Sequence, residues 1–152
     1  MSKNERLFQC TPAAVFKVLS DGWLYPTWVV GASRMRHVDP AWPAEGSVLH
    51  HSFGVWPMLI DDTTTVLKSV PDELMLLRAR GWPAGEADVL IQIAPAPGGC
   101  QVSIHEDAVK GPGTLIPAPM RHPILHWRNT ETLRRLAFIA ESKSGNPHPE
   151  RT

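Results

Sequence analysis

The chain has 152 residues, a length typical of a single domain that buries a substantial core, and its formal net charge at pH 7 is zero. Its lysines and arginines are scattered along the sequence, so the basic surface that nucleic-acid binding requires is not predicted. The cysteines are too few for a disulfide scaffold, and no apolar run is long enough to cross a membrane or to act as a secretory leader. We therefore expect a cytoplasmic protein with reduced thiols, no nucleic-acid partner and no membrane span.

The N-terminal part of the chain predicts one strand and two short helices. A strand over residues 6–10 is followed by Thr11-Pro12, where the threonine hydroxyl would cap a helix and the proline would occupy its first position. This helix stops at Asp21-Gly22, and residues 23–28 form a second, shorter helical segment.

The middle of the chain predicts about six antiparallel strands, because short apolar runs are separated there by turns rich in proline and glycine. These strands cover residues 32–38, 47–56, 59–70, 74–80, 87–94 and 101–109. Strands that are grouped in the sequence, apart from the helices, are typical of the α+β class, in which helices cover one face of an antiparallel sheet.

The last apolar-periodic run, residues 123–142, predicts a C-terminal helix that begins at Pro123 and is roughly 30 Å long. The side of this helix that we expect to face the sheet carries Leu125, Asn129, Thr132, Leu133, Leu136 and Ala140. Asn129 and Thr132 would either line a pocket or be hydrogen-bonded inside a filled core. Trp127 and Phe138, on the opposite side, would pack either on the short helices or on a second subunit, so a homodimer remains open.

The strand over residues 101–109 places a carboxylate on its apolar face. Val102, Ile104 and Glu106 alternate with outward-facing polar residues, so Glu106 is expected among aliphatic side chains. Desolvation there would raise its pKa and make it a candidate general acid or ligand anchor. The alternative is a carboxylate that is paired with an arginine, such as Arg78 or Arg80, or that lies at the wet mouth of the sheet.

One of two adjacent histidines, His50 or His51, must point inward, because neighbouring residues of a strand face opposite sides. Leu49 and Phe53 share a face with His51, which favours His51 as the inward residue. An inward histidine is either a candidate proton shuttle or a hydrogen-bonded core residue.

Several local motifs, in their order along the chain, resemble one superfamily. They are Thr11-Pro12 before Val15 and Phe16, Tyr25-Pro26 with Trp28 and Gly31, Val66 before Val70-Pro71 and Leu74, Gly98-Gly99 before Val102, and the last helix with Asn129 and Leu133. The chain resembles the SRPBCC superfamily, which includes START lipid-transfer domains, birch-pollen-type allergens and polyketide cyclases/dehydrases. The resemblance implies a helix-grip fold, in which a curved antiparallel sheet of about seven strands wraps around a long C-terminal helix.

The resemblance also implies a single domain over residues 1–143 and a hydrophobic cavity between sheet and helix, and residues 144–152 are expected to be a disordered tail. Tryptophans at the hairpin turns and after the first helix would fringe the mouth of the cavity, where they would stack on a flat ligand or pack structurally. The residues that we expect to bind a ligand are Trp28, Leu49, Phe53, Trp56, Trp82, Ile104, Leu125, Asn129, Thr132 and Leu133.

Other site chemistries have little support in the sequence. His122 and His126 are four residues apart but have no further ligands at metal-site spacing, so we expect no metal. Adjacent Asp61 and Asp62 would face opposite sides of a strand and would not form an acid-base pair. Neither a GxSxG motif nor a phosphate-binding glycine loop occurs, and we expect no cofactor.

The function that these observations favour is binding of a small hydrophobic molecule, lipid-like or aromatic and polyketide-like, with Glu106, Asn129 and His51 orienting it. One alternative is an enzyme of the polyketide cyclase/dehydrase type, in which Glu106 or His51 moves protons in the same cavity. Another is a co-chaperone-like module that binds a protein through hairpin tips bearing Trp56 and Met58.

Overall fold

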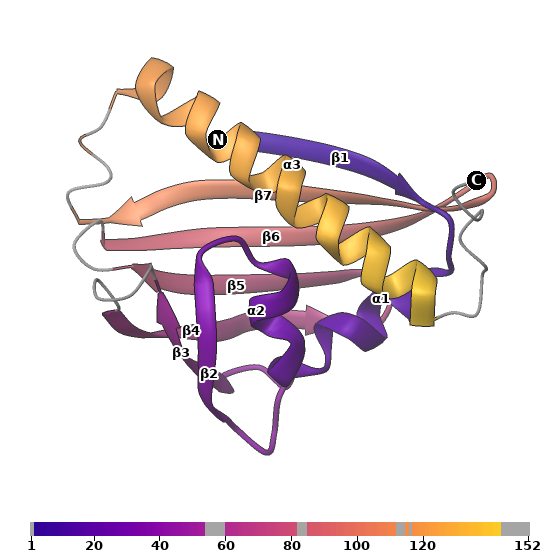
Figure 1. Ribbon diagram of the computed structural model, residues 1–152, viewed down its shortest axis with the longest axis horizontal. Helices are drawn as coiled ribbons and strands as arrows, with labels where there is room; N and C mark the ends of the chain where they lie inside the picture. Colours follow the sequence, from indigo (N-terminus) through magenta and orange to yellow (C-terminus); the bar gives the residue numbers. More distant parts are fainter. Residues whose placement is uncertain (1, 54–59, 82–84, 112–114, 116, 144–152) are drawn as a thin grey trace.

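The computed structural model describes residues 2–53, 60–81, 85–111, 115 and 117–143. These residues form one seven-stranded antiparallel sheet in the order β1-β7-β6-β5-β4-β3-β2 (Figure 1). The strands are β1 (Ser2–Phe8), β2 (Ala32–Val38), β3 (Val48–Phe53), β4 (Ile60–Val70), β5 (Leu74–Gly81), β6 (Gly85–Ala96) and β7 (Gly99–Lys110). The helical elements are α1 (Pro12–Leu19), η1 (Gly22–Leu24), α2 (Tyr25–Trp28) and α3 (Ala118–Lys143). The α+β helix-grip fold predicted from the sequence is confirmed.

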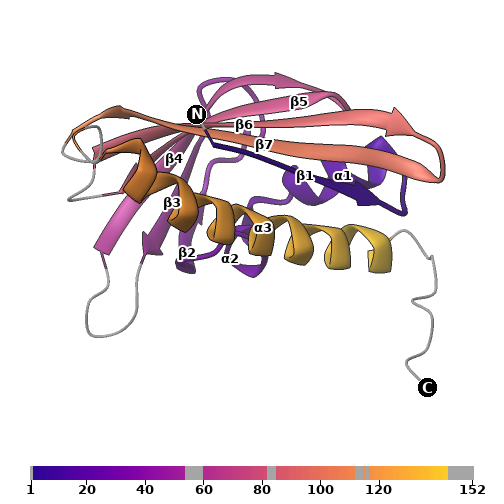
Figure 2. The same cartoon turned by 90° about the horizontal axis from the view of Figure 1, so that it is seen from above.

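The sheet curves over α3, which crosses one of its faces along nearly the whole length of the molecule (Figure 2). The helices α1 and α2 lie on that same side, beside the C-terminal half of α3 and the β2 end of the sheet (Figure 1). Two of the predicted site residues, Glu106 and Asn129, meet between the sheet and α3.

The first helix follows the predicted capping pattern. The Thr11 side chain accepts a hydrogen bond from the Ala14 N–H at 3.2 Å, and Pro12 stands at the first helical position. One stripe of the helix is buried against the sheet and α3, and it consists of Val15, Phe16, Val18 and Leu19. Because the cap satisfies a backbone donor that helix geometry leaves orphaned, this short helix has a defined start.

The C-terminal helix begins at Ala118, so the predicted start at Pro123 is wrong. A proline is favoured at a first helical position, whereas inside a helix it removes its own bond to the carbonyl four residues earlier and its ring crowds that carbonyl. Here that carbonyl belongs to Pro119, close to the helix start, and the long run after Pro123 carries the helix. None of the helices within the described residues is long and apolar enough to cross a membrane.

Every second residue along the central parts of β5, β6 and β7 is buried in the core, as the period of two of a strand requires. The sheet side of the core includes Met75, Leu77, Ile91, Ile93, Val102 and Ile104, and its α3 side includes Leu133, Leu136, Ala137 and Ala140. Cys10 and Cys100 are buried free thiols, and burial raises the pKa of Cys10 to about 12. Trp127 and Phe138, by contrast, are exposed on the outer side of α3.

Candidate functional site

The centre of the site is Glu106 on β7, whose side chain faces α3. The residue is 5% exposed, on the same buried face as Val102 and Ile104, so the predicted inward orientation is confirmed. Its Oε1 accepts a hydrogen bond from Arg128 Nη1 at 2.9 Å, and its Oε2 accepts one from Asn129 Nδ2 at 3.0 Å. The carboxylate is therefore engaged through both oxygens and joins β7, the second strand from one edge of the sheet, to α3.

The arginine that pairs with Glu106 comes from the helix rather than from a neighbouring strand. Arg78 forms a two-point ion pair with Asp88 across β5 and β6, with its Nε 2.8 Å from Oδ1, and Arg80 lies 3.7 Å from Glu86. Arg78 and Arg80 are thus paired with carboxylates of β6, and the arginine that pairs with Glu106 is Arg128.

Two neighbouring α3 residues hold the segment after α2. Arg128 Nε donates to the Val30 carbonyl at 3.1 Å, and Thr132 Oγ1 accepts from the Val30 N–H at 3.4 Å. Asn129 and Thr132 are both buried, so the predicted inward face of the helix is confirmed for these two polar residues. Because α3 binds both the sheet and this segment, it sets the spacing of the walls around the site.

A cavity of about 30 Å³ lies between these walls. Its aliphatic lining includes Leu77, Val89, Ile91 and Ile104, and its other lining residues include Tyr25, Trp28, Glu106, Arg128, Asn129 and Thr132. This volume is close to the share of one water molecule in the liquid, whereas ligand pockets typically measure about 300–1,000 Å³. In this form the cavity is far smaller than a typical ligand pocket.

Trp28 lines this cavity and carries a buried polar group that has no partner among the described residues. The residue is 4% exposed, and its ring meets that of Tyr25 edge-on, with centroids 5.3 Å apart. Its indole Nε1–H is buried and forms no hydrogen bond with any residue that the structure describes. Buried donors are nearly always paired, so this one marks a place where an acceptor would be favourable.

His51 is fully buried, which confirms its predicted inward orientation. Its Nε2 is 2.8 Å from Thr64 Oγ1, and that hydroxyl is 3.2 Å from the Tyr25 hydroxyl. The Tyr25 ring stacks on the imidazole with centroids 5.3 Å apart. His51 is not part of the cavity wall, and Tyr25 lies between the two.

Burial lowers the pKa of His51 from 6.5 to about 4, partly against the attraction of Asp62. Between these two pH values the unfolded chain binds a proton at His51 that the native protein does not, so this residue's contribution to stability should fall as the pH drops from about 6.5 to about 4. Chemical unfolding of the wild type and of His51→Gln across this pH range tests the lowered pKa of His51. The wild type should lose stability relative to the variant as the pH falls. A difference in stability that stays constant with pH would contradict the lowered pKa.

The remaining predicted site residues divide into three groups. Leu49 and Leu133 are buried in the core outside the described cavity, and Leu125 is only half-buried. Phe53 ends β3, but its side chain lies outside the described part of the structure, as do Trp56, Trp82 and the tail over residues 144–152. The sequence placed Tyr25 together with Trp28 near the mouth of the cavity but did not single it out as a site residue. Sequence reasoning missed Arg128, and its one signal was its place one helical turn before Thr132, on the same side of the helix.

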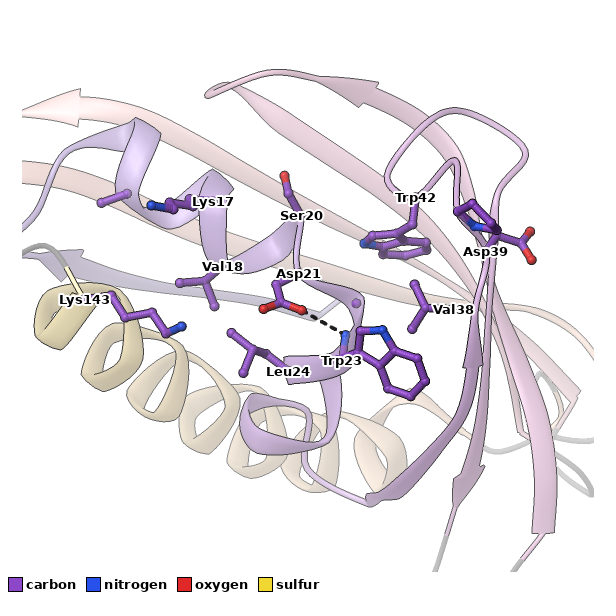
Figure 3. A pocket seen from close by; sticks show the side chains of 13 residues that line it. Lys17, Val18, Ser20, Asp21, Trp23, Leu24, Val38, Asp39, Trp42 and Lys143 are labelled. Atoms are coloured by element: carbon purple, nitrogen blue, oxygen red, sulfur yellow. Dashed lines mark hydrogen bonds between the residues drawn. The ribbon is translucent and has the colours of Figure 1, made fainter.

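A larger cavity, of about 460 Å³, lies on the outer side of α1 (Figure 3). Its lining includes Lys17, Asp21, Trp23, Asp39, Trp42 and Lys143. Sequence reasoning did not predict this outer groove, because its lining comes from α1, η1, β2, the following loop and the end of α3.

The polar groups of the outer groove are largely used by its own scaffold. Trp42 Nε1 donates to the Leu19 carbonyl at 3.1 Å, Asp39 Oδ2 accepts from the Val48 N–H at 2.9 Å, and Asp21 Oδ1 accepts from the Trp23 N–H at 3.2 Å. The inner cavity, although smaller, combines aliphatic walls with convergent buried polar groups, which are the marks of a ligand site. We therefore take the inner cavity as the candidate site.

No group of three or more histidine, cysteine or acidic side chains that could hold a metal ion occurs among the residues that the structure describes. The chemistry available at the inner cavity is thus that of one carboxylate, one guanidinium, two amide or hydroxyl side chains, and two aromatic residues with polar groups.

Comparison with known proteins places this geometry in context. A family model described as "Polyketide cyclase / dehydrase and lipid transport" matches residues 3–141. No curated protein matches the chain. Among solved structures, protein NE0264 from Nitrosomonas europaea is similar over 93% of this chain and 94% of its own, with 14% identity and a TM-score of 0.70.

Two other solved structures are also similar to this chain. The di-domain ARO/CYC StfQ from the steffimycin biosynthetic pathway matches 94% of this chain and 51% of its own, with 13% identity and a TM-score of 0.72. Ara h 8.0201 matches 92% of this chain and 96% of its own, with 11% identity and a TM-score of 0.67. At these identities the likeness is one of fold.

Proposed function

Because the chain belongs to the family of polyketide cyclases/dehydrases and lipid-transport proteins, we propose that it binds one small hydrophobic molecule, lipid-like or aromatic and polyketide-like, between the sheet and α3. The observation that carries this proposal is the buried cluster of Glu106, Arg128 and Asn129 set into a wall of aliphatic side chains. Apolar walls would supply most of the binding free energy, at roughly 25 cal/mol per Å² before association costs, and the cluster would orient the ligand.

Binding at this site requires the cavity to enlarge. We propose that the element that moves is α2, which has four residues and is followed by a segment that Arg128 and Thr132 hold to α3 through the Val30 backbone. Gly31 follows Val30 directly, and its φ of 100° lies in the left-handed region that favours glycine. Movement of α2 away from the sheet would extend the cavity along Trp28 and Tyr25 while the sheet stays intact.

Ligand binding is favoured over catalysis by the state of the two candidate proton-transfer groups. A general acid or base must come within hydrogen-bond reach of the reacting atom. Both oxygens of Glu106 are already engaged by α3, and His51 lies behind Tyr25 and stays neutral at pH 7 because burial lowers its pKa to about 4. These contacts support a binding protein in which Glu106 positions helix and ligand.

An enzyme of the cyclase/dehydrase type is the second candidate, and Glu106→Gln separates the two. The amide keeps an oxygen for Arg128 and retains the size of the side chain, but it cannot transfer a proton at neutral pH. We expect the variant to fold and to bind hydrophobic probes with affinity reduced by no more than about tenfold, the order of one charge-assisted hydrogen bond. If the wild type cyclises or dehydrates a polyketide substrate and the variant does not, Glu106 is catalytic.

Native mass spectrometry of freshly purified protein, followed by organic extraction, tests the proposed function. We expect one apolar molecule per chain, either retained from the host or added from a panel of lipids and aromatic polyketides. An unshifted mass with every member of the panel would contradict the proposal. The co-chaperone-like alternative rests on Trp56 and Met58, which lie outside the described residues.

A further inference from the structure

We propose that the indole N–H of Trp28 is the polar anchor of the ligand site and donates a hydrogen bond to the carbonyl oxygen of a neutral hydrophobic ligand, such as an aryl ketone. This inference rests on the proposed function and names the chemical class of its ligand.

The first step is the state of the Trp28 donor. Its Nε1 is buried and forms no hydrogen bond with a described residue. The Trp28 side chain is part of the cavity wall. The other described tryptophans do not share this state: Trp42 donates to the Leu19 carbonyl, and Trp23 and Trp127 are exposed to solvent. Since an indole is a donor only, the group that would satisfy Trp28 must be an acceptor.

The second step is the charge of the surroundings. Glu106 and Arg128 neutralise each other at 2.9 Å, and Asn129 also points an N–H at the carboxylate. A ligand carboxylate would bring an uncompensated charge beside this neutral pair, which is costly away from water. A ligand hydroxyl would bring a donor as well as an acceptor, and its donor would have to share a Glu106 oxygen that already accepts a hydrogen bond from α3. A ketone or ester oxygen brings an acceptor alone.

The third step is size. The cavity of about 30 Å³ has room for one carbonyl group or one water molecule, and its aliphatic residues line the rest of the wall. The carbonyl would therefore enter first beside Trp28, and the apolar body of the ligand would follow as α2 moves. An ordered water at the same place is the competing occupant, and the ketone would displace it.

The experiment uses two probes of nearly the same shape, the ketone 2-acetylnaphthalene and the alkene 2-isopropenylnaphthalene. The alkene has a methylene group in place of the carbonyl oxygen of the ketone. Dissociation constants of both are measured for the wild type, for Trp28→Phe, and for the matched control Trp23→Phe in the outer groove. The ratio of the alkene constant to the ketone constant should fall about tenfold in Trp28→Phe, the order of one lost hydrogen bond in a buried site, and should stay unchanged in Trp23→Phe.

A second measurement does not depend on the variant. In wild-type protein labelled with ¹⁵N-tryptophan, the Trp28 indole proton should move downfield with the ketone and not with the alkene. If both probes bind but neither the ratio nor the indole proton distinguishes them, the anchor is wrong and the proposed function stands. If neither probe binds at millimolar concentration, this inference falls together with the binding of aromatic ligands.

Discussion

Replacing Arg128 by methionine is expected to lower the free energy of unfolding at pH 7 by about 3–5 kcal/mol, because it leaves the Glu106 carboxylate buried without its cation. The Glu106 side chain is 6% exposed and Arg128 is 26% exposed, so water replaces little of the lost interaction. The variant also loses the hydrogen bond to the Val30 carbonyl, which ties α2 to α3. Urea unfolding, followed by far-ultraviolet circular dichroism, measures the change.

A double variant shows whether the loss comes from the unpaired charge. Adding Glu106→Leu to Arg128→Met removes the stranded carboxylate, and the double variant should recover most of the lost stability. The matched control is Arg134→Met on the solvent side of the same helix, where Arg134 pairs with Glu131. It should leave the unfolding midpoint nearly unchanged, since an exposed ion pair is screened by water. A double variant as unstable as Arg128→Met would contradict the explanation.

Shortening Leu136 to alanine should cost about 2–5 kcal/mol, because the leucine is fully buried between α3 and the sheet and its removal leaves a cavity. Phe138→Ala, two residues along the same helix, is the control: Phe138 is 62% exposed, and its loss should change stability by about 0.5 kcal/mol or less. Equal losses of stability for the two variants would mean that the outer face of α3 is covered in solution, as it would be in a homodimer that packs through Trp127 and Phe138.

The orientation of single side chains could be predicted from the sequence because it depends on local periodicity. A period of two placed Glu106 and His51 on the inward face of their strands, and a period of 3.6 placed Asn129 and Thr132 on the inward face of the helix, and all four are buried. The superfamily resemblance, carried by the order of several weak motifs, implied the helix-grip fold and a sheet of about seven strands, and both are confirmed.

The partners of these side chains could not be predicted, because they depend on how distant segments pack. Glu106 was expected to lie among aliphatic side chains, to pair with an arginine such as Arg78 or Arg80, or to lie at the wet mouth of the sheet. Its partner is instead Arg128, which borders the inward face of α3 and whose long side chain reaches the carboxylate. The helix start was misplaced because a local proline preference competed with a helix that continues through Pro123. The indole of Trp28 has no hydrogen-bond acceptor among the described residues, and such an unpaired donor has no signature in the sequence.

The location of bound ligand is the central claim, and backbone amide chemical shifts recorded during titration with 2-acetylnaphthalene test it most directly. The inner cavity predicts saturable shifts at Ile91, Ile104 and Asn129, whose side chains line it, and at the Val30 amide, which is held by Thr132. Shifts confined to Trp23, Val38 and other residues around the outer groove would contradict the account and would move the binding site to the far side of α1.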